Sequence, residues 1–305
     1  MDKNFMGNQF AYDLIVSHVE QENPGPMILY GSSGLGKLSA AKSAASFMLG
    51  VPMERLPLST DYYLLDKENE LIKVEDILML LERSSISSVS GKKVFLIRNA
   101  ENMNIQAQNK LLKLLEDRNQ TNKLILTCSR NLLLDTILSR CNVISFYPLS
   151  TQEMEEYLKQ QGMEREGRHL AAYLCDSCPY NWEQVKNVYD DLKATYAELQ
   201  KIKRREDIFR ILHLLMEKDS KSFYEVHSKH LVIGLQLLQY VYYHIMLLKL
   251  KRRLPDQVEA ELKDLEHIYS LPQVYNATVA IEQHKLQAVR KYTKNDFFDL
   301  IRNLV

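Results

Sequence analysis

The sequence predicts an α/β domain built on a parallel sheet, followed by two helical regions. Short apolar runs alternate with helical patterns over residues 1–149, which is typical of strands joined by helices. One apolar run leads directly into the glycine-rich segment Gly31–Leu38. Beyond residue 150 the pattern is helical. A chain of 305 residues is long enough for two or three domains of this kind.

The first region reads as alternating elements. Apolar runs predict strands at Met27–Tyr30, Arg55–Leu58, Lys93–Ile97, Lys123–Cys128 and Val143–Phe146. Apolar residues at helical spacing predict helices at Lys37–Leu49, Val74–Ser85, Ile105–Glu116 and Leu132–Leu138.

The boundary of this region is predicted at Pro148-Leu149-Ser150. Ser150 or Thr151 can cap a helix that runs to Leu158, with acidic residues in its first turns. A small helical region then covers residues 150–203. Residues 204–305 carry apolar stripes too broad for a free surface, so we expect a helical bundle that packs against other subunits. The predicted domains are therefore 1–149, 150–203 and 204–305.

Composition excludes several classes of function. Lys and Arg balance Asp and Glu at 39 each, so bulk charge does not drive non-specific DNA binding. No run is expected to span a membrane, since polar residues interrupt Leu231–Leu250. The N-terminal residues do not have the pattern of a signal peptide. We therefore expect a soluble, cytoplasmic protein. Cys175-x-x-Cys178 is half of a zinc site without a second pair, and we expect no metal.

The segment Gly31–Leu38 has the pattern of a phosphate-binding loop. Gly31, Gly34 and Gly36 let backbone N–H groups turn toward an anion, and Lys37 can reach the outer phosphates. The hydroxyl that normally follows the lysine and binds Mg²⁺ is replaced by Leu38, and a hydrocarbon cannot bind a hard cation. The loop keeps the donors for ATP, ADP or another anion, without the metal ligand.

A second part of a hydrolytic site is also missing. The strand Val94–Ile97 ends in Arg98-Asn99, where a nucleotide hydrolase needs carboxylates for Mg²⁺ and water. Glu101 follows two residues late, where we expect a helix start. Two missing parts predict that this chain does not hydrolyse ATP by itself.

Ser139-Arg140-Cys141 precedes the last predicted strand. Taken alone, Arg140 reads as a surface arginine. Cys141 lacks a neighbouring base signal, so a nucleophilic role is not expected.

Together, the phosphate loop, the helix Gln108–Glu116 and the triplet Ser139-Arg140-Cys141 resemble bacterial clamp loaders of the AAA+ family, with the delta-prime type of the DNA polymerase III complex as the nearest match. The resemblance is strong over about the first 150 residues. It extends to 151–305 only as a lid and a collar of similar size. It implies an open ring of five subunits that loads a sliding clamp onto primed DNA.

The resemblance also assigns roles. Arg140 is implied to reach the nucleotide of a neighbouring gamma or tau subunit as an arginine finger, with Ser139 and Cys141 orienting it. The delta subunit, the clamp and DNA are implied as further partners. The delta-prime type does not hydrolyse ATP, in agreement with Leu38, and nothing in the chain resembles a polymerase active site.

Other departures from the family point the same way. The stretch Cys178–Trp182, where the lid's arginine sensor is expected, has no basic residue. Residues 50–71 contain no cysteine, so the family's zinc module is absent. Thr127 and Ser129 stand at the place of a γ-phosphate sensor, although either hydroxyl can equally bond to backbone at a strand end.

Three alternatives stay open. The chain could hydrolyse its own nucleotide with displaced ligands, or serve as a structural ring subunit without a working Arg140. A clamp-opening delta subunit is a more distant alternative, because that type generally lacks the Ser-Arg-Cys triplet.

Overall fold

In the computed structural model, the chain forms two compact units. The structure describes all residues except 1–6, 68–69, 117–120, 215–221, 290 and 305. The first unit takes Met1–Tyr157 and Cys178–Tyr180, and the second takes Leu158–Ser177 and Asn181–Val305. The predicted division of the helical part at residue 203 stays a prediction.

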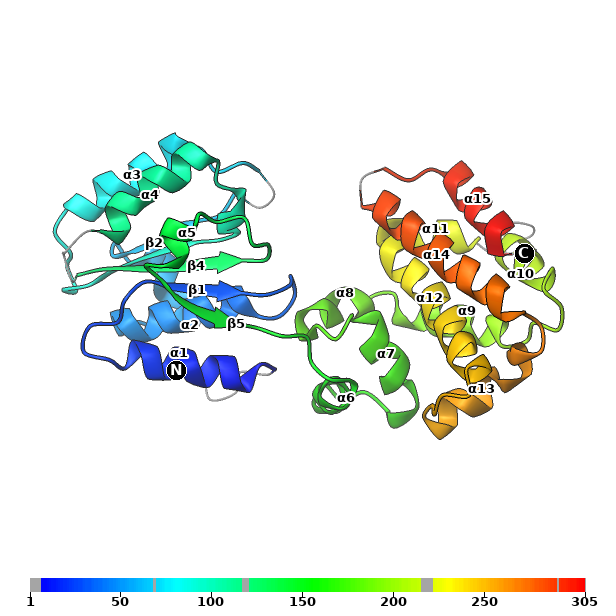
Figure 1. Cartoon of the computed structure of the whole chain (residues 1–305). Helices are drawn as coiled ribbons and strands as arrows, with labels where there is room; N and C mark the ends of the chain where they lie inside the picture. The colour runs from blue at the N-terminus through cyan, green and yellow to red at the C-terminus, as the bar shows by residue number, and fades with distance from the viewer. Residues whose placement is uncertain (1–6, 68–69, 117–120, 215–221, 290, 305) are drawn as a thin grey trace. The chain divides into compact units, whose positions relative to one another are not determined.

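The first unit is a parallel five-stranded sheet with the strand order β2-β3-β4-β1-β5 (Figure 1). Its strands are β1 (Met27–Tyr30), β2 (Tyr62–Leu65), β3 (Lys93–Ile97), β4 (Asn122–Cys128) and β5 (Asn142–Ser145). The register sets Tyr30 beside both Cys128 and Ser145, so three neighbouring strands end level with one another. Ligands of open parallel sheets bind at this carboxyl edge.

Helices cover both faces of the sheet (Figure 1). One core contains residues of α1 (Gln9–Val19) and α2 (Lys37–Leu49) packed on the sheet. The core on the other face contains residues of α3 (Val74–Ser85), α4 (Ile105–Leu115) and α5 (Asp135–Leu138). The central strands β1, β3 and β4 are buried on both faces, which explains their continuous apolar sequence, whereas the edge strands β2 and β5 expose Leu64 and Val143. The predicted α/β class is confirmed.

One predicted strand is wrong. Arg55–Leu58 lies within the 3₁₀-helix η1 (Met53–Leu58), and Tyr62–Leu65 supplies the strand that pairs with β3. Pro57 lacks the N–H that a strand needs for its ladder, whereas it is tolerated in a short helical turn. The predicted helix Leu132–Leu138 is also shorter, since only Asp135–Leu138 is helical.

The helix at the predicted boundary begins as expected. It is α6 (Thr151–Gln160), which the division between the units crosses. The Ser150 hydroxyl accepts a hydrogen bond from the Glu153 N–H at 3.3 Å, and the Glu153 carboxylate accepts from the Ser150 N–H at 2.8 Å. These reciprocal bonds form a capping box. The Ser150 hydroxyl also donates to the Glu153 carboxylate at 2.7 Å, and this bond, together with the one from the Ser150 N–H, lowers the pKa of Glu153.

The second unit is helical in its described residues. Its further helices are α7 (Arg168–Leu174), α8 (Trp182–Lys186), α9 (Tyr189–Leu199), α10 (Asp207–Leu214), α11 (Phe223–His227), α12 (Leu231–Lys249), α13 (Asp256–Glu266), α14 (Leu271–Ala288) and α15 (Lys294–Leu304). Helix α12 is central and packs against α13 and α14.

By length and composition alone, α12 could cross a membrane, so the polar residues that interrupt its apolar run do not exclude it on that test. Its most apolar window is 67% buried among the unit's own helices. Core helices of soluble proteins pass the same test, and α12 is placed as a core helix.

Candidate functional site

The predicted phosphate-binding loop, residues 31–38, lies between β1 and α2, at the carboxyl edge of the sheet. The Gly31 N–H donates to the Cys128 carbonyl at 3.1 Å, which joins the start of the loop to the end of β4. A Cβ atom at Gly31 would lie 2.3 Å from the Phe146 carbonyl oxygen, so only glycine fits there. Gly36 has a φ of 86° and begins α2, whose N-terminus points its N–H groups toward the loop.

Lys37 is turned into its own loop. Its ammonium donates to the carbonyls of Gly31 and Ser32, each at 2.6 Å, and the residue is only 7% exposed. Burial lowers the pKa of Lys37, and the nearby Glu101 carboxylate opposes that shift. The loop therefore satisfies this cation with backbone oxygens.

Neither Mg²⁺ ligand of a hydrolytic site is present. Leu38 is half-buried and packs against the core of α1 and α2. Arg98, at the end of β3, forms an ion pair with Asp66 at 2.9 Å. The residues present fit an anion but do not fit a magnesium–nucleotide pair, because carboxylates and hydroxyls are the ligands that Mg²⁺ requires.

Glu101 lies in the short 3₁₀-helix η2 (Ala100–Asn102) and is buried. One carboxylate oxygen accepts a hydrogen bond from the Ser129 N–H at 2.9 Å. This acid therefore fixes the segment that follows β4. The sequence indicated its place within a helical turn but gave no sign of its burial or its partner.

The two candidate sensor hydroxyls differ in their surroundings. The Thr127 hydroxyl accepts a hydrogen bond from the Asn99 N–H at 3.1 Å, which matches the alternative that it bonds to backbone. Ser129 contributes its own N–H to Glu101. At the place of the lid sensor, the Tyr180 N–H donates to the Gly34 carbonyl at 3.3 Å, and Cys178 is buried in the core beneath the loop.

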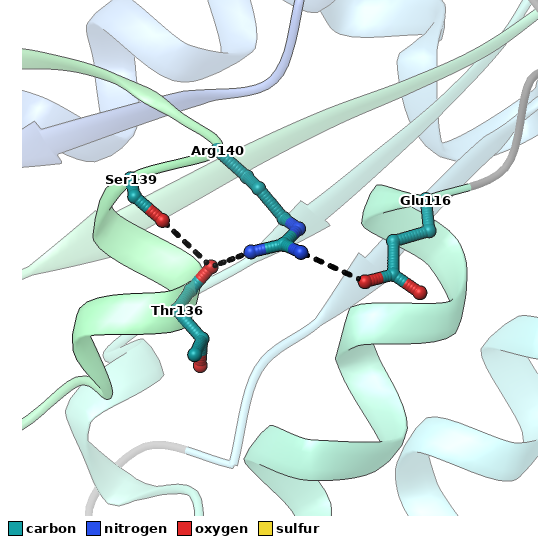
Figure 2. A network of polar contacts seen from close by, with 4 residues as sticks. All are labelled: Glu116, Thr136, Ser139 and Arg140. Carbon is teal, nitrogen blue, oxygen red and sulfur yellow. Dashed lines mark hydrogen bonds and ion pairs between the residues drawn. The ribbon is translucent and has the colours of Figure 1, made fainter.

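Arg140 stands in the turn between α5 and β5. One terminal nitrogen, Nη1, donates to the Thr136 carbonyl at 3.0 Å, and the other, Nη2, donates to Glu116 Oε1 at 3.0 Å (Figure 2). The Arg140 side chain is 41% exposed, and that of Glu116 is 56% exposed. A guanidinium carries five N–H donors, so three are left beyond these two bonds.

The neighbours of Arg140 hold the turn. The Ser139 hydroxyl donates to the same Thr136 carbonyl at 3.3 Å (Figure 2). Cys141 packs against the core of α3, α4 and α5, and burial raises the pKa of its thiol to about 12. A thiol with that pKa carries almost no thiolate at neutral pH, so Cys141 is a packing residue in this unit.

Helix α4 fixes the segment that leads to Arg140. Gln108, which is 3% exposed, donates to the Leu132 carbonyl at 3.2 Å and accepts from the Leu134 N–H at 2.8 Å. Glu116 follows the last turn of the same helix and holds the guanidinium. The amphipathic pattern of α4 predicted its apolar face and not these two polar attachments.

Metal ligands do not gather anywhere in the described part of the chain. No group of three or more His, Cys, Asp or Glu side chains is arranged to hold a metal ion among those residues. Cys178 belongs to the core of the first unit, and Cys175 is buried in the second.

Comparison with known proteins finds similarity to subunits of DNA polymerase III. A family described as "DNA polymerase III, delta subunit" matches residues 11–150. The delta-prime subunit of DNA polymerase III from Bacillus subtilis is 25% identical over 258 residues, which cover 76% of this chain and 75% of that protein. The chain therefore resembles a delta-prime subunit over about three quarters of its length.

More distant similarities agree with this class. A replication factor C small subunit from Aeropyrum pernix is 27% identical to this chain over 159 residues, about half of each protein. A DNA polymerase III gamma subunit-related protein from Thermotoga maritima has a TM-score of 0.54 at 14% identity and covers 96% of this chain and 98% of that one. RuvB from the same organism reaches a TM-score of 0.50 at 15% identity, over 85% and 83% of the two chains. The last two similarities establish the AAA+ fold alone.

Proposed function

We propose that this chain is a non-hydrolysing, delta-prime-like subunit of a DNA polymerase III clamp loader, and that Arg140 acts on the ATP of a neighbouring subunit. The complex would place a sliding clamp on primed DNA in the cytoplasm. The delta subunit and the ATPase subunits, gamma or tau, would be its neighbours in the ring.

The observation that carries this proposal is the contrast between the two cations at the motifs. Lys37 is buried and bonded to its own loop, whereas Arg140 is part-exposed and keeps three donors. A planar guanidinium can donate two parallel hydrogen bonds to phosphate oxygens, which suits charge that develops on a γ-phosphate. Arg140, rather than Lys37, is therefore the cation that we propose contacts the nucleotide of another subunit.

The missing metal ligands support the non-hydrolysing role. A phosphoryl-transfer site depends on bound Mg²⁺ and on a residue that positions the attacking water. Leu38 and the Arg98–Asp66 ion pair occupy the places of those groups. Any anion bound at Gly31, Gly34, Gly36 and Lys37 would therefore stay unhydrolysed.

An exposed apolar stripe supports docking of the C-terminal region, residues 204–305, against other subunits. Leu271, Tyr275, Val279 and Leu286 of α14 recur at helical spacing, and each is at least 38% exposed. Exposed apolar stripes of this kind are typical of subunit interfaces. We propose that residues 204–305 pack against the equivalent regions of neighbouring subunits.

The test is the DNA- and clamp-stimulated ATPase rate of the complex, reconstituted with wild-type chain or with Arg140→Ala. We expect a fall of about tenfold or more, within the range for arginine fingers, with assembly unchanged in gel filtration. Arg83→Ala is the matched control, because Arg83 is also exposed on the first unit. Its guanidinium carbon lies 5.1 Å from the centroid of the Tyr63 ring.

The remaining outcomes separate the alternatives. An unchanged rate would make the chain a structural ring subunit. Loss of assembly in Arg140→Ala alone would make Arg140 a packing residue. Magnesium-dependent hydrolysis by the isolated chain, abolished by Lys37→Ala, would establish it as an ATPase.

A further inference from the structure

Glu116 holds Arg140 from outside the Ser-Arg-Cys triplet. Its carboxylate bonds to Arg140 Nη2 at 3.0 Å, and the two residues lie 24 positions apart in the sequence. Both side chains are solvent-exposed, so their ion pair contributes little to folding. A role in stability alone does not account for it.

The position of Glu116 makes this point stronger. Glu116 is the C-cap of α4, and its N–H donates to the Leu112 carbonyl at 2.9 Å. A carboxylate at the C-terminal end of a helix is disfavoured by the helix dipole. The Arg140 guanidinium offsets this unfavourable placement.

The geometry orients the guanidinium. The Thr136 carbonyl accepts from Nη1 and Glu116 accepts from Nη2, so both terminal nitrogens are fixed and the plane of the group is defined (Figure 2). Each terminal nitrogen keeps a second N–H, and Nε keeps its own. An arginine held in this way loses less conformational freedom when it meets a phosphate than a freely rotating one does.

We propose that Glu116 is a positioning residue for Arg140, which pre-orients the guanidinium for a nucleotide on a neighbouring subunit. This inference rests on the proposed function of Arg140. Glu116 itself does not touch the nucleotide, and its contribution passes entirely through the arginine.

The experiment compares Glu116→Ala, Glu116→Gln and Glu198→Ala in the reconstituted complex. Glu198 is the matched control, since it forms a similar exposed ion pair with Lys201 at 2.6 Å in the second unit. We expect Glu116→Ala to lower kcat about threefold to tenfold with the KM for ATP unchanged, because orientation acts on the chemical step. Glu116→Gln keeps an acceptor oxygen and should retain part of the lost rate.

A double mutant tests whether Glu116 works through Arg140. In the Arg140→Ala background, Glu116→Ala should cause no further loss, since the residue that it orients is already gone. The melting temperature of each variant should stay within about 2 °C of wild type, as expected for an exposed pair.

Three results would overturn the inference. An unchanged kcat would mean that orientation by Glu116 does not matter. A higher kcat would mean that Glu116 holds the arginine back, and an equal loss in both backgrounds would mean that it acts independently of Arg140. If Arg140→Ala itself has no effect, the proposed function fails, and the inference fails with it.

Discussion

Lys37 and Arg140 are both cations in motifs that we expect from the sequence to contact phosphate, yet their surroundings are opposite. Lys37 is 7% exposed and donates to two carbonyls of its own loop. The Arg140 side chain is 41% exposed, and one of its two contacts is a surface carboxylate. Lys37 is bonded to the protein's own backbone, whereas the Arg140 side chain can reach a partner at the surface.

The difference shows that two motif cations in one chain can lie in opposite environments. At the loop, close packing around Gly31 and Leu38 preserves the shape of a phosphate site without its metal ligands. At the turn before β5, a weak exposed ion pair keeps a charged group oriented at little cost in stability. Four predictions test this contrast.

The largest expected effect is on Arg140. Arg140→Lys keeps the charge but loses the planar fork, so we expect the stimulated ATPase rate of the complex to fall about tenfold or more, nearly as far as with alanine. Steady-state ATPase assays of the two variants side by side give the answer. A lysine variant at wild-type rate would show that only charge is required.

The second prediction concerns the pH dependence of stability, which limits the pH range in which the ATPase assays can be run. Burial lowers the pKa of His227 and of His244 from 6.5 to about 4. Asp191 opposes the shift at His227, and the Tyr240 carbonyl opposes it at His244, while the neighbouring His169 adds to it there. The folded second unit therefore excludes protons that the unfolded chain binds below pH 6.5.

Above about pH 6.5 both histidines are neutral in the folded and in the unfolded chain, so they do not reduce the free energy of unfolding. As the pH falls from 6.5 toward 4, only the unfolded chain takes up these protons, and the free energy of unfolding decreases. Between pH 7 and pH 5 the free energy of unfolding should drop by about 2 kcal/mol for each ring. Urea unfolding at both pH values measures this, and His227→Leu should remove about half of the drop. An activity loss at pH 5 that accompanies unfolding does not count against the proposed role of Arg140. A pH dependence unchanged by His227→Leu would contradict the assignment.

A smaller effect is expected at the loop. Leu38→Thr introduces a hydroxyl that can bind Mg²⁺, yet the end of β3 still carries Arg98-Asn99 in place of carboxylates. We expect no ATP hydrolysis by the isolated chain and a loss of about 1 kcal/mol in the free energy of unfolding from reduced apolar burial. Leu38→Met is the volume-matched control. Hydrolysis by the threonine variant would mean that one missing ligand alone had disabled the site.

The smallest expected effect is on Lys37. Lys37→Met keeps most of the side-chain volume and removes the ammonium from the loop. If the charge serves only the loop, the ATPase rate of the assembled complex should stay within about twofold of wild type. A tenfold fall with intact assembly would show that an anion at this loop controls the neighbouring subunit.

Much of the fold could be predicted, because local patterns decide it. The buried parallel strands are continuous apolar runs, and β3 and the helices α2 and α3 have the predicted bounds. The strand at Tyr62–Leu65 was missed because its aromatic residues follow an apolar run that Pro57 turns into a 3₁₀-helix. Pairing with β3 supplies hydrogen bonds that no local pattern reveals.

The site was predicted in part for the same reason. Gly31 and Lys37 stand together in the sequence, so their spacing predicts a shared loop. The pairing of Glu116 with Arg140 depends on how α4 and α5 pack, and the bonds of Glu101 and Gln108 depend on strand order. Contacts of this kind need the three-dimensional arrangement.

The three residues Cys178–Tyr180 give the first unit an unusual topology. These residues belong to the first unit, although the residues before and after them in the sequence belong to the second unit. Cys178 is part of a core that packs on the sheet. A fragment that ends at Tyr157 would therefore lack a piece of its own interior. The first unit is complete only when translation has proceeded past residue 180, so the chain cannot finish folding strictly one segment after another.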